Sequence, residues 1–444
     1  EVEEAAADAA DAAACASLSG GQREAVRRAM REQLLVLTGG PGTGKTYTVK
    51  QIVEGWRRRG KRVVLACPTA RAATVLAATV GCPASTIHRL LEYNPQEEKY
   101  KRNQLRPLEA DAIVVDEASM LDLDLAAKLL DALPGHTSVL LVGDSDQLPS
   151  VGPGSVLLDL LAASRVPRVT LDTIFRQDPS GDIARTAQLV NRGLPLTHLL
   201  QTPPKGVRPG GCLFVPAADE AAAAEIISGG LLDWLKRAEY DLDTELQVLA
   251  PVKRGAAGTF ALNQRLKQRL NPSVGRDAMQ LGVGVGDQVI QLTNDYENLV
   301  FNGDIGRVTA VRPGRGARFN VSFNPRDVLA RGGSDEAGSS GVEVEYGTKA
   351  LGRDVALSYA LTVHKSQGSE YAVVVLPVLP QHGRMLYRNL FYTGISRAKQ
   401  LLVLVGSEEA IAAAVDNSAM QRRDTMLTER VDDDEIAPPC VRHE

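Results

Sequence analysis

The sequence of 444 residues has no run of 18 or more apolar residues, which excludes a membrane-spanning helix. Its five cysteines are scattered, with no C-x-x-C pair, and this argues against a zinc site and for a reducing compartment. The formal net charge is only −4, so the chain as a whole exerts no electrostatic attraction on nucleic acid. Any binding to nucleic acid must therefore come from a local basic groove.

The length is sufficient for two to three domains with a large buried core, and an apolar content of 44% is ordinary for a globular protein. Strand and helix patterns alternate over residues 34–163, which predicts one doubly wound α/β domain. Strand patterns at 169–177, 244–251 and 286–292 predict a second α/β region. Residues 294–353 have short strands, many glycines and no helical period, and this favours a small β-barrel insert.

Residues 34–48, LLVLTGGPGTGKTYT, contain a complete G-x-x-x-x-G-K-[ST] motif behind an apolar run that predicts a buried strand. Glycines let the backbone curl around an anion, and the helix expected from Lys45 adds the positive end of its dipole. Lys45 can reach the β- and γ-phosphates, and the Thr46 hydroxyl can ligate Mg²⁺. The residues expected to bind the nucleotide are Gly39, Gly40, Pro41, Gly42, Thr43, Gly44, Lys45, Thr46 and Tyr47.

Gln22 lies in a helix expected at residues 17–30, directly upstream of the phosphate loop. A glutamine at this place can hydrogen-bond the edge of an adenine ring. The alternative is an ordinary polar residue on the surface.

Residues 112–117, AIVVDE, predict a buried strand that ends in two carboxylates. Asp116 suits a Mg²⁺ ion held through water, and Glu117 suits orienting and deprotonating an attacking water. A further strand at 138–142 leads to Gln147, on the ligand side of an open parallel sheet. Gln147 is therefore a candidate sensor of the γ-phosphate.

Hydroxyls and backbone N–H groups suited to gripping a phosphodiester backbone occur at expected strand and helix ends, at Pro68, Thr69 and residues 85–88. The polar stretch at 92–107 interrupts the regular pattern. It predicts either a plain surface loop or a short hairpin.

The order of these motifs resembles that of superfamily 1 helicases, and in particular the RecD-like branch, whose members move 5′→3′ on single-stranded DNA. The motifs, which extend over roughly residues 17–410, are Gln22, GGPGTGKT, CPTARAA, STIHRLL, VVDEASM, LVGDSDQLPSVGPG, IFRQ, LTVHKSQGSEY and YTGISRAK. The resemblance implies an α/β fold of two RecA-like P-loop NTPase domains with ATP between them. It also implies a short insert in the first domain and an SH3-like β-barrel insert in the second.

The resemblance sets the expected domain boundaries. They are an Ala-rich N-terminal remnant at 1–16, a first RecA-like domain at 17–165 with a pin-like insert at 92–108, a second RecA-like domain at 166–293 and 354–420, an SH3-like insert at 294–353 and an acidic tail at 421–444. In relatives the insert is the pin that splits the duplex. This copy is short and has no aromatic tip beyond Tyr93 and Tyr100, so translocation is a firmer expectation than strand separation.

Further roles come from the resemblance. Arg176 and Arg397 would act as arginine fingers on the γ-phosphate, with structural salt bridges as the alternative. Gly368 and Glu370 would link the DNA grip to the nucleotide site. The expected DNA contacts, for which packed or solvated side chains are the alternative, are Pro68, Thr69, Thr86, His88, Thr362, His364 and Ser366.

The sequence thus predicts an ATP- and Mg²⁺-dependent 5′→3′ DNA helicase or translocase of recombination or repair. We expect a monomer that binds single-stranded DNA and its junctions with duplex, without membrane contact. A cytoplasmic, nucleoid-associated location is expected, or an organellar one if a targeting segment preceded Glu1. The alternatives are the helicase segment of a conjugative relaxase and a nucleotide-regulated DNA-binding module without unwinding.

Overall fold

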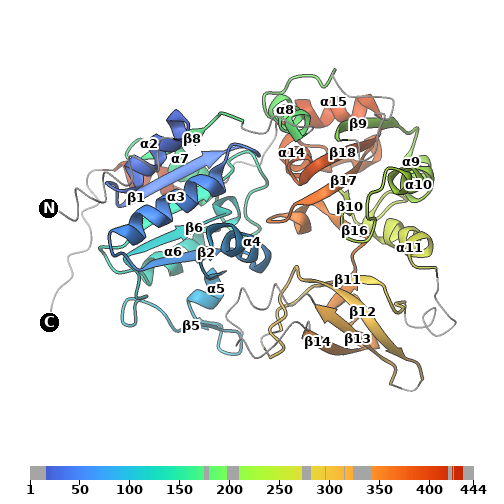
Figure 1. Ribbon diagram of the computed structural model, residues 1–444, viewed down its shortest axis with the longest axis horizontal. Helices are drawn as coiled ribbons and strands as arrows, with labels where there is room; N and C mark the ends of the chain where they lie inside the picture. The colour runs from blue at the N-terminus through green and yellow to red at the C-terminus, as the bar shows by residue number, and fades with distance from the viewer. Residues whose placement is uncertain are drawn as a thin grey trace. The chain divides into compact units, whose positions relative to one another are not determined.

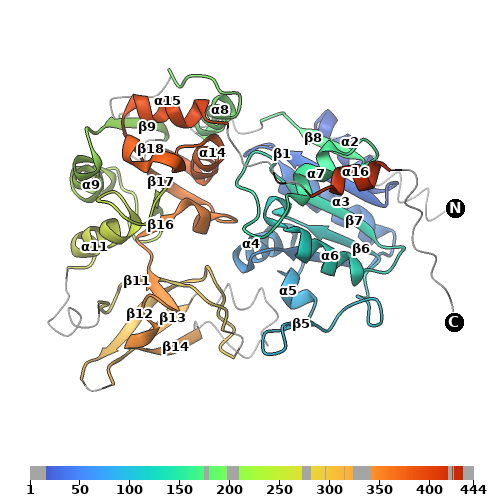
Figure 2. The same cartoon turned by 180° about the vertical axis from the view of Figure 1, so that it is seen from behind.

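The computed structural model describes residues 17–174, 180–197, 210–272, 282–295, 297–314, 316–323, 342–418, 423 and 425–433. These form two compact units, drawn in Figures 1 and 2. Unit 1 takes in the described residues up to Pro68, Val75–Thr173 and those after residue 420, and unit 2 takes in Thr69–Thr74 and those from Ile174 to residue 418. Within the described ranges, no helix has the length and apolar character needed to cross a membrane.

Unit 1 is built on a parallel sheet of β1 (Leu34–Gly39), β2 (Val63–Cys67), β3 (Ala84–Thr86), β6 (Ala112–Val115), β7 (Ser138–Gly143) and β8 (Arg168–Leu171). The strands lie in the order β3-β2-β6-β7-β1-β8. Strands β6 and β7 are buried at every residue, as expected for apolar runs in a parallel sheet covered on both faces.

The helical segments of unit 1 are α2 (Gly20–Ala29), α3 (Lys45–Arg58), the part of α4 (Ala70–Val80) that begins at Val75, α5 (Ile87–Leu90), η2 (Ala118–Met120), α6 (Leu123–Asp131), α7 (Val156–Ala162) and α16 (Leu427–Asp432). Helices α2 and α3 cover one face of the sheet, and α6, α7 and α16 cover the other (Figures 1 and 2). Side-chain caps fix several helix starts. Ser19 and Asp122, for example, accept backbone N–H groups at the beginning of α2 and α6.

Unit 2 contains a parallel sheet of β9 (Gly211–Pro216), β10 (Leu246–Ala250), β16 (Ala360–Thr362), β17 (Tyr371–Val378) and β18 (Ala398–Gly406), in the order β16-β10-β17-β18-β9. Its helical segments are α8 (Ser180–Asn191), α9 (Glu220–Ser228), α10 (Gly230–Arg237), α11 (Thr259–Leu270), η4 (Val363–Ser366), η5 (Pro380–Met385), α14 (Arg388–Ser396) and α15 (Glu408–Asp416). Helices α9, α10 and α11 pack on the apolar core at one face of this sheet.

The two parallel sheets share one topology. When the strands of each unit are numbered along the chain, both sheets have the spatial order 3-2-4-5-1, and unit 1 adds β8 at its edge. The predicted pair of α/β, RecA-like domains is therefore confirmed. The equivalent strands are β1 and β9, β2 and β10, β3 and β16, β6 and β17, and β7 and β18.

An antiparallel β insert follows α11 in unit 2. It consists of β11 (Gln288–Gln291), β12 (Ile305–Arg312), β13 (Arg318–Phe323), β14 (Val342–Gly347), η3 (Thr348–Ala350) and β15 (Val355–Leu357), with strand order β14-β13-β12-β11-β15. The insert is wider than the predicted range 294–353, because β11 and β15 lie outside that range and both pair within this sheet. A short strand does not reveal from its own pattern which sheet it joins.

Two other predicted boundaries are wrong. Strand β8 pairs with β1, so the first domain extends past residue 165. The tail predicted at 421–444 contains α16, whose Leu427 and Val431 pack against the core of unit 1. Residues 1–16, the Gly/Ser stretch at 332–341 and residues 434–444 lie outside the described part of the chain.

Candidate active site

The phosphate loop joins β1 to α3 and has the backbone geometry of an anion cradle. Gly42 and Gly44 have φ of +76° and +78°, a region that residues with a side chain rarely adopt. A Cβ on Gly39 would lie 2.7 Å from the carbonyl oxygen of Leu171, so this position also requires glycine. The Thr43 hydroxyl donates to the carbonyl of Gly40 at 2.8 Å and braces the curve.

Lys45 is the first residue of α3, and its ammonium lies inside the loop. It donates to the carbonyls of Gly39 and Gly40, the latter at 3.0 Å. Thr46 and Tyr47 follow in the first turn, and Tyr47 is 47% exposed. The positive charge, the helix N-terminus and the loop N–H groups together suit a triphosphate.

Gln22 is only 3% exposed, so the alternative that it is an ordinary surface residue is wrong. Its Oε1 accepts the backbone N–H of Ser19 at 3.0 Å, and the Ser19 hydroxyl accepts the backbone N–H of Gln22. This capping box gives Gln22 a structural role that the sequence analysis did not weigh. Its amide NH₂ remains the group that can donate to a nucleobase acceptor.

Asp116 and Glu117 follow β6 directly. Desolvation, reinforced by the charge of Glu117, raises the pKa of Asp116 to about 7. Two interactions oppose this shift: the backbone N–H of Glu117 donates to Oδ1 of Asp116 at 2.9 Å, and the charge of Lys45 attracts the carboxylate. Glu117 has φ 54°, a left-handed conformation that costs a residue with a side chain of the order of 1 kcal/mol. Such strain at the end of a central strand is typical of a functional position.

Gln147 lies past the end of β7 and is 7% exposed. Its Nε2 donates to the buried carboxylate of Asp144 at 3.1 Å, which orients the amide, while its Oε1 has no hydrogen-bond partner among the described residues. The Thr38 and Ser119 hydroxyls, near the ends of β1 and β6, are likewise buried and unpaired. Unpaired buried polar atoms are costly, so a group of them at the carboxyl ends of adjacent strands indicates a site that a ligand completes.

These residues fit a Mg²⁺–nucleotide. Thr46 supplies a hydroxyl and Asp116 a carboxylate, and both are hard oxygen donors of the kind that Mg²⁺ prefers. The described residues contain no cluster of three or more His, Cys, Asp or Glu able to hold a metal. One hydroxyl and one carboxylate suit an ion whose other ligands are phosphate oxygens and water.

The predicted DNA contacts occupy matching places in the two units. In unit 1, Thr86 ends the edge strand β3, and its hydroxyl accepts the N–H of Arg89 at 3.2 Å to cap α5. In unit 2, Thr362 ends the edge strand β16, and its hydroxyl accepts the N–H of Lys365 at 3.4 Å to cap η4. His88 and His364 each follow their threonine by two positions.

Both histidines have a lowered pKa. Desolvation is the main cause for each, and Asp122 partly opposes it at His88. The imidazoles are therefore neutral at pH 7 and offer one donor and one acceptor nitrogen rather than a charge. Ser366 is fully buried and donates to the carbonyl of Val363, so its hydroxyl braces η4. Thr69, after Pro68, caps α4 by accepting the N–H of Ala72.

The insert predicted as a loop or hairpin is a hairpin of β4 (Tyr93–Asn94) and β5 (Lys99–Tyr100). The rings of Tyr93 and Tyr100 pair across it with centroids 4.8 Å apart, and the His88 ring lies 5.6 Å from Tyr93. The aromatic rings thus stand at the base of the hairpin beside the predicted DNA contact. Its turn, residues 95–98, is PQEE and carries no aromatic residue.

Arg397 directly follows α14 as its C-cap and is 3% exposed. Its guanidinium donates to the carbonyls of Thr393 and Ser369 and to the hydroxyl of Ser396, and no carboxylate pairs with it in the described part of the chain. The structural salt bridge considered as the alternative is therefore not what holds this side chain. Gly368 has φ +71°, and Glu370 pairs with Lys399 at 2.8 Å. Arg176 lies outside the described residues.

Comparison with protein-family models matches three parts of the chain. Residues 17–202 match an AAA domain, residues 262–323 match the SH3 domain of ATP-dependent RecD-like DNA helicases, and residues 357–405 match a UvrD-like helicase C-terminal domain. The match to the SH3 domain covers most of α11 and strands β11, β12 and β13 of the β insert.

Among curated proteins, the RecBCD enzyme subunit RecD of Mycolicibacterium smegmatis is 32% identical over 90% of this chain and 73% of its own length. The chain belongs to the RecD-like family of superfamily 1 helicases. The ATP-dependent RecD2 DNA helicase of Deinococcus radiodurans is 36% identical over 90% of this chain, which spans 50% of that relative's length. The predicted family is thereby confirmed.

Solved structures agree on the fold. The Pif1 helicase of Candida albicans has a TM-score of 0.51 and 20% identity, covering 89% of this RecD-like chain and 96% of its own. A Bacteroides Pif1 helicase solved with ADP-AlF3 and single-stranded DNA has a TM-score of 0.50 and 17% identity, covering 87% and 92%.

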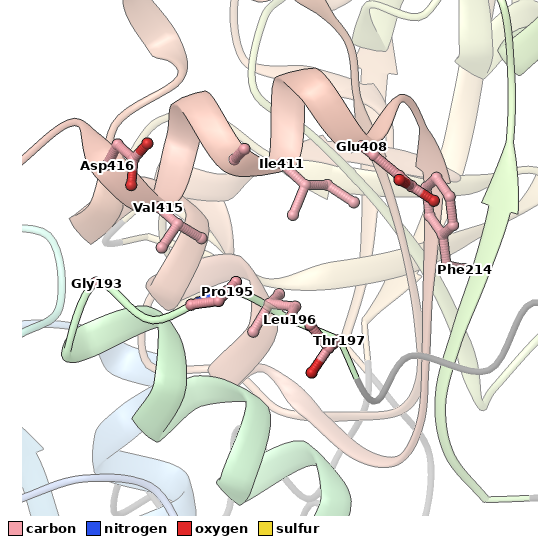
Figure 3. Close-up of a pocket in the computed structure, with 10 residues that line it drawn as sticks. Gly193, Pro195, Leu196, Thr197, Phe214, Glu408, Ile411, Val415 and Asp416 are labelled. Atoms are coloured by element: carbon pink, nitrogen blue, oxygen red, sulfur yellow. The ribbon is translucent and has the colours of Figure 1, made fainter.

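A separate cavity of about 610 Å³ lies within unit 2, between β9, the loop after α8 and helix α15 (Figure 3). Pro195, Leu196, Ile411 and Val415 give it an apolar wall, with Glu408 at one end (Figure 3). No residue of the predicted nucleotide or DNA site lines it. The cavity is therefore distinct from the candidate nucleotide and DNA sites.

Sequence reasoning missed several residues that shape the site. Asp144 orients Gln147, and Thr38 and Ser119 add buried hydroxyls near the ends of β1 and β6 that have no hydrogen-bond partner among the described residues. In the sequence these three residues stand out only as polar residues at or just after the ends of predicted strands. Arg423, which contacts the loop after Gln147, gave no local signal at all.

Proposed function

We propose that this RecD-like chain hydrolyses ATP with Mg²⁺ and uses the energy to move 5′→3′ along single-stranded DNA in recombination or repair. The observation that carries the proposal is the combination in unit 1 of an anion-cradling loop, two carboxylates and an unpaired Gln147 Oε1 at adjacent strand ends. Bound Mg²⁺ would neutralise charge developing on the phosphates.

Each residue has a task in that reaction. Lys45 holds the β- and γ-phosphates, and Thr46 and Asp116 hold the ion, directly or through water. Glu117 accepts a proton from the attacking water, while the Oε1 of Gln147 accepts a hydrogen bond from the same water and so places it. Arg397 supplies the cation that stabilises the γ-phosphate as charge builds up there.

The strand grip rests on the repeated Thr-x-His element at the edges of both sheets. Each threonine hydroxyl and each neutral imidazole suits a phosphate or sugar oxygen, contacts that position a strand without reading its sequence. The name of one relative, the ATP-dependent RecD2 DNA helicase, supports DNA as the substrate.

The hairpin favours a second candidate, a translocase that does not separate strands. Its turn carries Glu97 and Glu98 rather than an aromatic wedge, and these carboxylates repel a phosphate backbone. The bend at residues 103–106 does present Leu105, which is 97% exposed, as an apolar group that could enter a duplex end.

The deciding experiment measures ATP hydrolysis with and without single-stranded DNA, then unwinding of duplexes that carry a 5′ or a 3′ tail. The proposal expects DNA-stimulated hydrolysis, and displacement of fluorescent markers from single strands in the 5′→3′ direction only. Stimulation with marker displacement but without duplex unwinding would select the translocase. Absence of stimulation by any DNA would overturn the proposal.

A further inference from the structure

The C-terminal arm, defined as Arg423 with residues 425–433, belongs to unit 1 and packs on α7. The Thr428 hydroxyl donates to the carbonyl of Asp159 in that helix at 3.0 Å. At the far end of α16, the Asp432 carboxylate accepts the backbone N–H groups of Ser164 and Arg165 at 2.9 and 3.2 Å. The arm is therefore anchored at two places along its length.

Arg423 makes the first contact of the arm and the one with the most hydrogen bonds. Its Nη1 donates to the carbonyls of Gly152 and Gly154, both at 2.7 Å, and lies 3.0 Å from the Ser150 hydroxyl oxygen. Its Nη2 donates to the carbonyl of Ser150 at 2.8 Å. One guanidinium thus gathers the carbonyls of three residues in the loop 150–154.

That loop needs a cation at this place. Three carbonyl dipoles that converge on one point repel one another, and the single hydroxyl proton of Ser150 can satisfy only one of them at a time. Ser150 is 2% exposed and Gly154 is buried with φ +81°, so the two ends of the turn lie in the protein interior, while Val151 at its outer side is 89% exposed. A planar guanidinium with several fixed donors matches such a set, whereas an ammonium ion on a flexible chain does not.

The loop continues from the candidate γ-phosphate sensor. Gln147 is joined to it by Leu148, which is 1% exposed, and by Pro149, so little slack separates the sensor from Ser150. On its other side the loop bonds α6, because the Leu123 N–H donates to the carbonyl of Pro153 at 2.9 Å. A shift of the loop would therefore move the buried amide whose placement the hydrolysis step requires.

We propose that Arg423 is a positioning residue for ATP hydrolysis: by holding the carbonyls of the loop 150–154 it fixes Gln147 in the nucleotide site. The proposal rests on the proposed function, since it assigns a task within that reaction. Arg423 touches neither nucleotide nor water and acts through the loop. Loss of its guanidinium lowers the rate of the chemical step and leaves the phosphate loop that binds ATP unchanged.

The test compares steady-state ATP hydrolysis of the full chain, with saturating single-stranded DNA, in four proteins. These are wild type, Arg423→Ala, Arg430→Ala as a charge-matched change at an exposed position of the same arm, and Asp432→Ala as a change that loosens α16 alone. Arg423→Ala should lower kcat about tenfold with the KM for ATP within about twofold, and Arg430→Ala should match wild type. Asp432→Ala should lower the melting temperature and keep kcat.

Chemical rescue with a guanidinium compound shows whether Arg423 positions the loop 150–154 or only attaches the arm to unit 1. Methylguanidinium at millimolar concentration should restore part of the lost kcat of Arg423→Ala and leave the other three proteins unchanged, because only that variant has a site of its shape. An unchanged kcat in Arg423→Ala, an equal loss in Asp432→Ala, or no rescue in a folded Arg423→Ala protein would each overturn the inference. If wild type itself shows no DNA-stimulated hydrolysis, the proposed function fails instead.

Discussion

The two RecA-like sheets have the same strand order but differ at the places where chemistry would occur. After the first strand, unit 1 has the glycine loop and Lys45, whereas unit 2 runs from β9 into α9 with Asp219 as its cap. The Asp219 carboxylate accepts the N–H of Ala222, so the helix terminus that could bind phosphate is already satisfied by a negative charge. Unit 2 therefore has no phosphate cradle at the equivalent place.

The fourth strand shows the same contrast. In unit 1 it leads directly to Asp116 and Glu117, while in unit 2 it leads to Leu379 and the buried His382. The edge strands, however, end alike, in Thr86 and Thr362. The two units thus share the threonine that ends the edge strand, whereas the phosphate loop and the pair of carboxylates occur in unit 1 alone among the described residues. This is what a motor needs if two units grip a strand in turn and one of them holds the nucleotide.

The strongest test of that contrast is Lys45→Ala. Because Lys45 supplies the ammonium inside the phosphate loop, its loss should reduce ATP hydrolysis to background. Lys50→Ala, on the same helix, is the matched control and should retain wild-type turnover. Wild-type turnover in Lys45→Ala, measured by phosphate release, would remove the assignment of unit 1 as the hydrolytic unit.

Arg397→Ala tests whether unit 2 contributes a cation despite lacking a cradle. We expect ATP to bind with near-normal affinity and hydrolysis to fall roughly a hundredfold, the usual effect of losing one group that stabilises transition-state charge. Fluorescent-nucleotide binding and single-turnover hydrolysis measure the two steps. Arg384→Ala, an exposed arginine of unit 2, is the control. Loss of nucleotide binding in Arg397→Ala would point to a structural role.

The sequence predicted well those features that are contiguous in the chain. The phosphate loop and the strand ending in Asp116 depend on local residue order, and the structure has both at strand ends. The wrong predictions concern partners distant in sequence. Strand β8 joins β1 rather than the second sheet, and Arg423 lies about 270 positions from the loop that it contacts. No local pattern encodes such pairings, and a six-residue helix such as α16 has too short a period to reveal its buried face.

The buried His382, which follows the fourth strand of unit 2, should make the stability of that unit depend on pH. Burial lowers the pKa of His382 to about 4, and its Nδ1 accepts the N–H of Leu379 at 3.3 Å, which requires the neutral ring. A lowered pKa means that the unfolded chain binds the proton more readily, so stability is lost as pH falls from about 6.5 towards 4.

At pH 5 that loss should amount to about 2 kcal/mol in unit 2. Hydrogen exchange at pH 7 and pH 5, corrected for intrinsic rates, would place it in η5 and β17. His382→Asn keeps an acceptor and should reduce the pH dependence, while His136→Gln, an exposed change in unit 1, should not. An equal pH dependence in His382→Asn would exclude this residue as the cause.

The duplicated element is tested by removing one hydroxyl at a time. Thr86→Val and Thr362→Val should each weaken binding of single-stranded DNA about fivefold, which corresponds to one hydrogen bond of about 1 kcal/mol. Fluorescence anisotropy measures the affinity, and Thr79→Val, which also removes a hydroxyl from a helix, is the control. Thr→Ser at either position keeps the cap and should keep the affinity.

Equal, additive losses in Thr86→Val and Thr362→Val would mean that both units hold the strand alike. A loss confined to Thr86→Val would place the grip in unit 1 and leave the resemblance of the two edges a matter of fold alone.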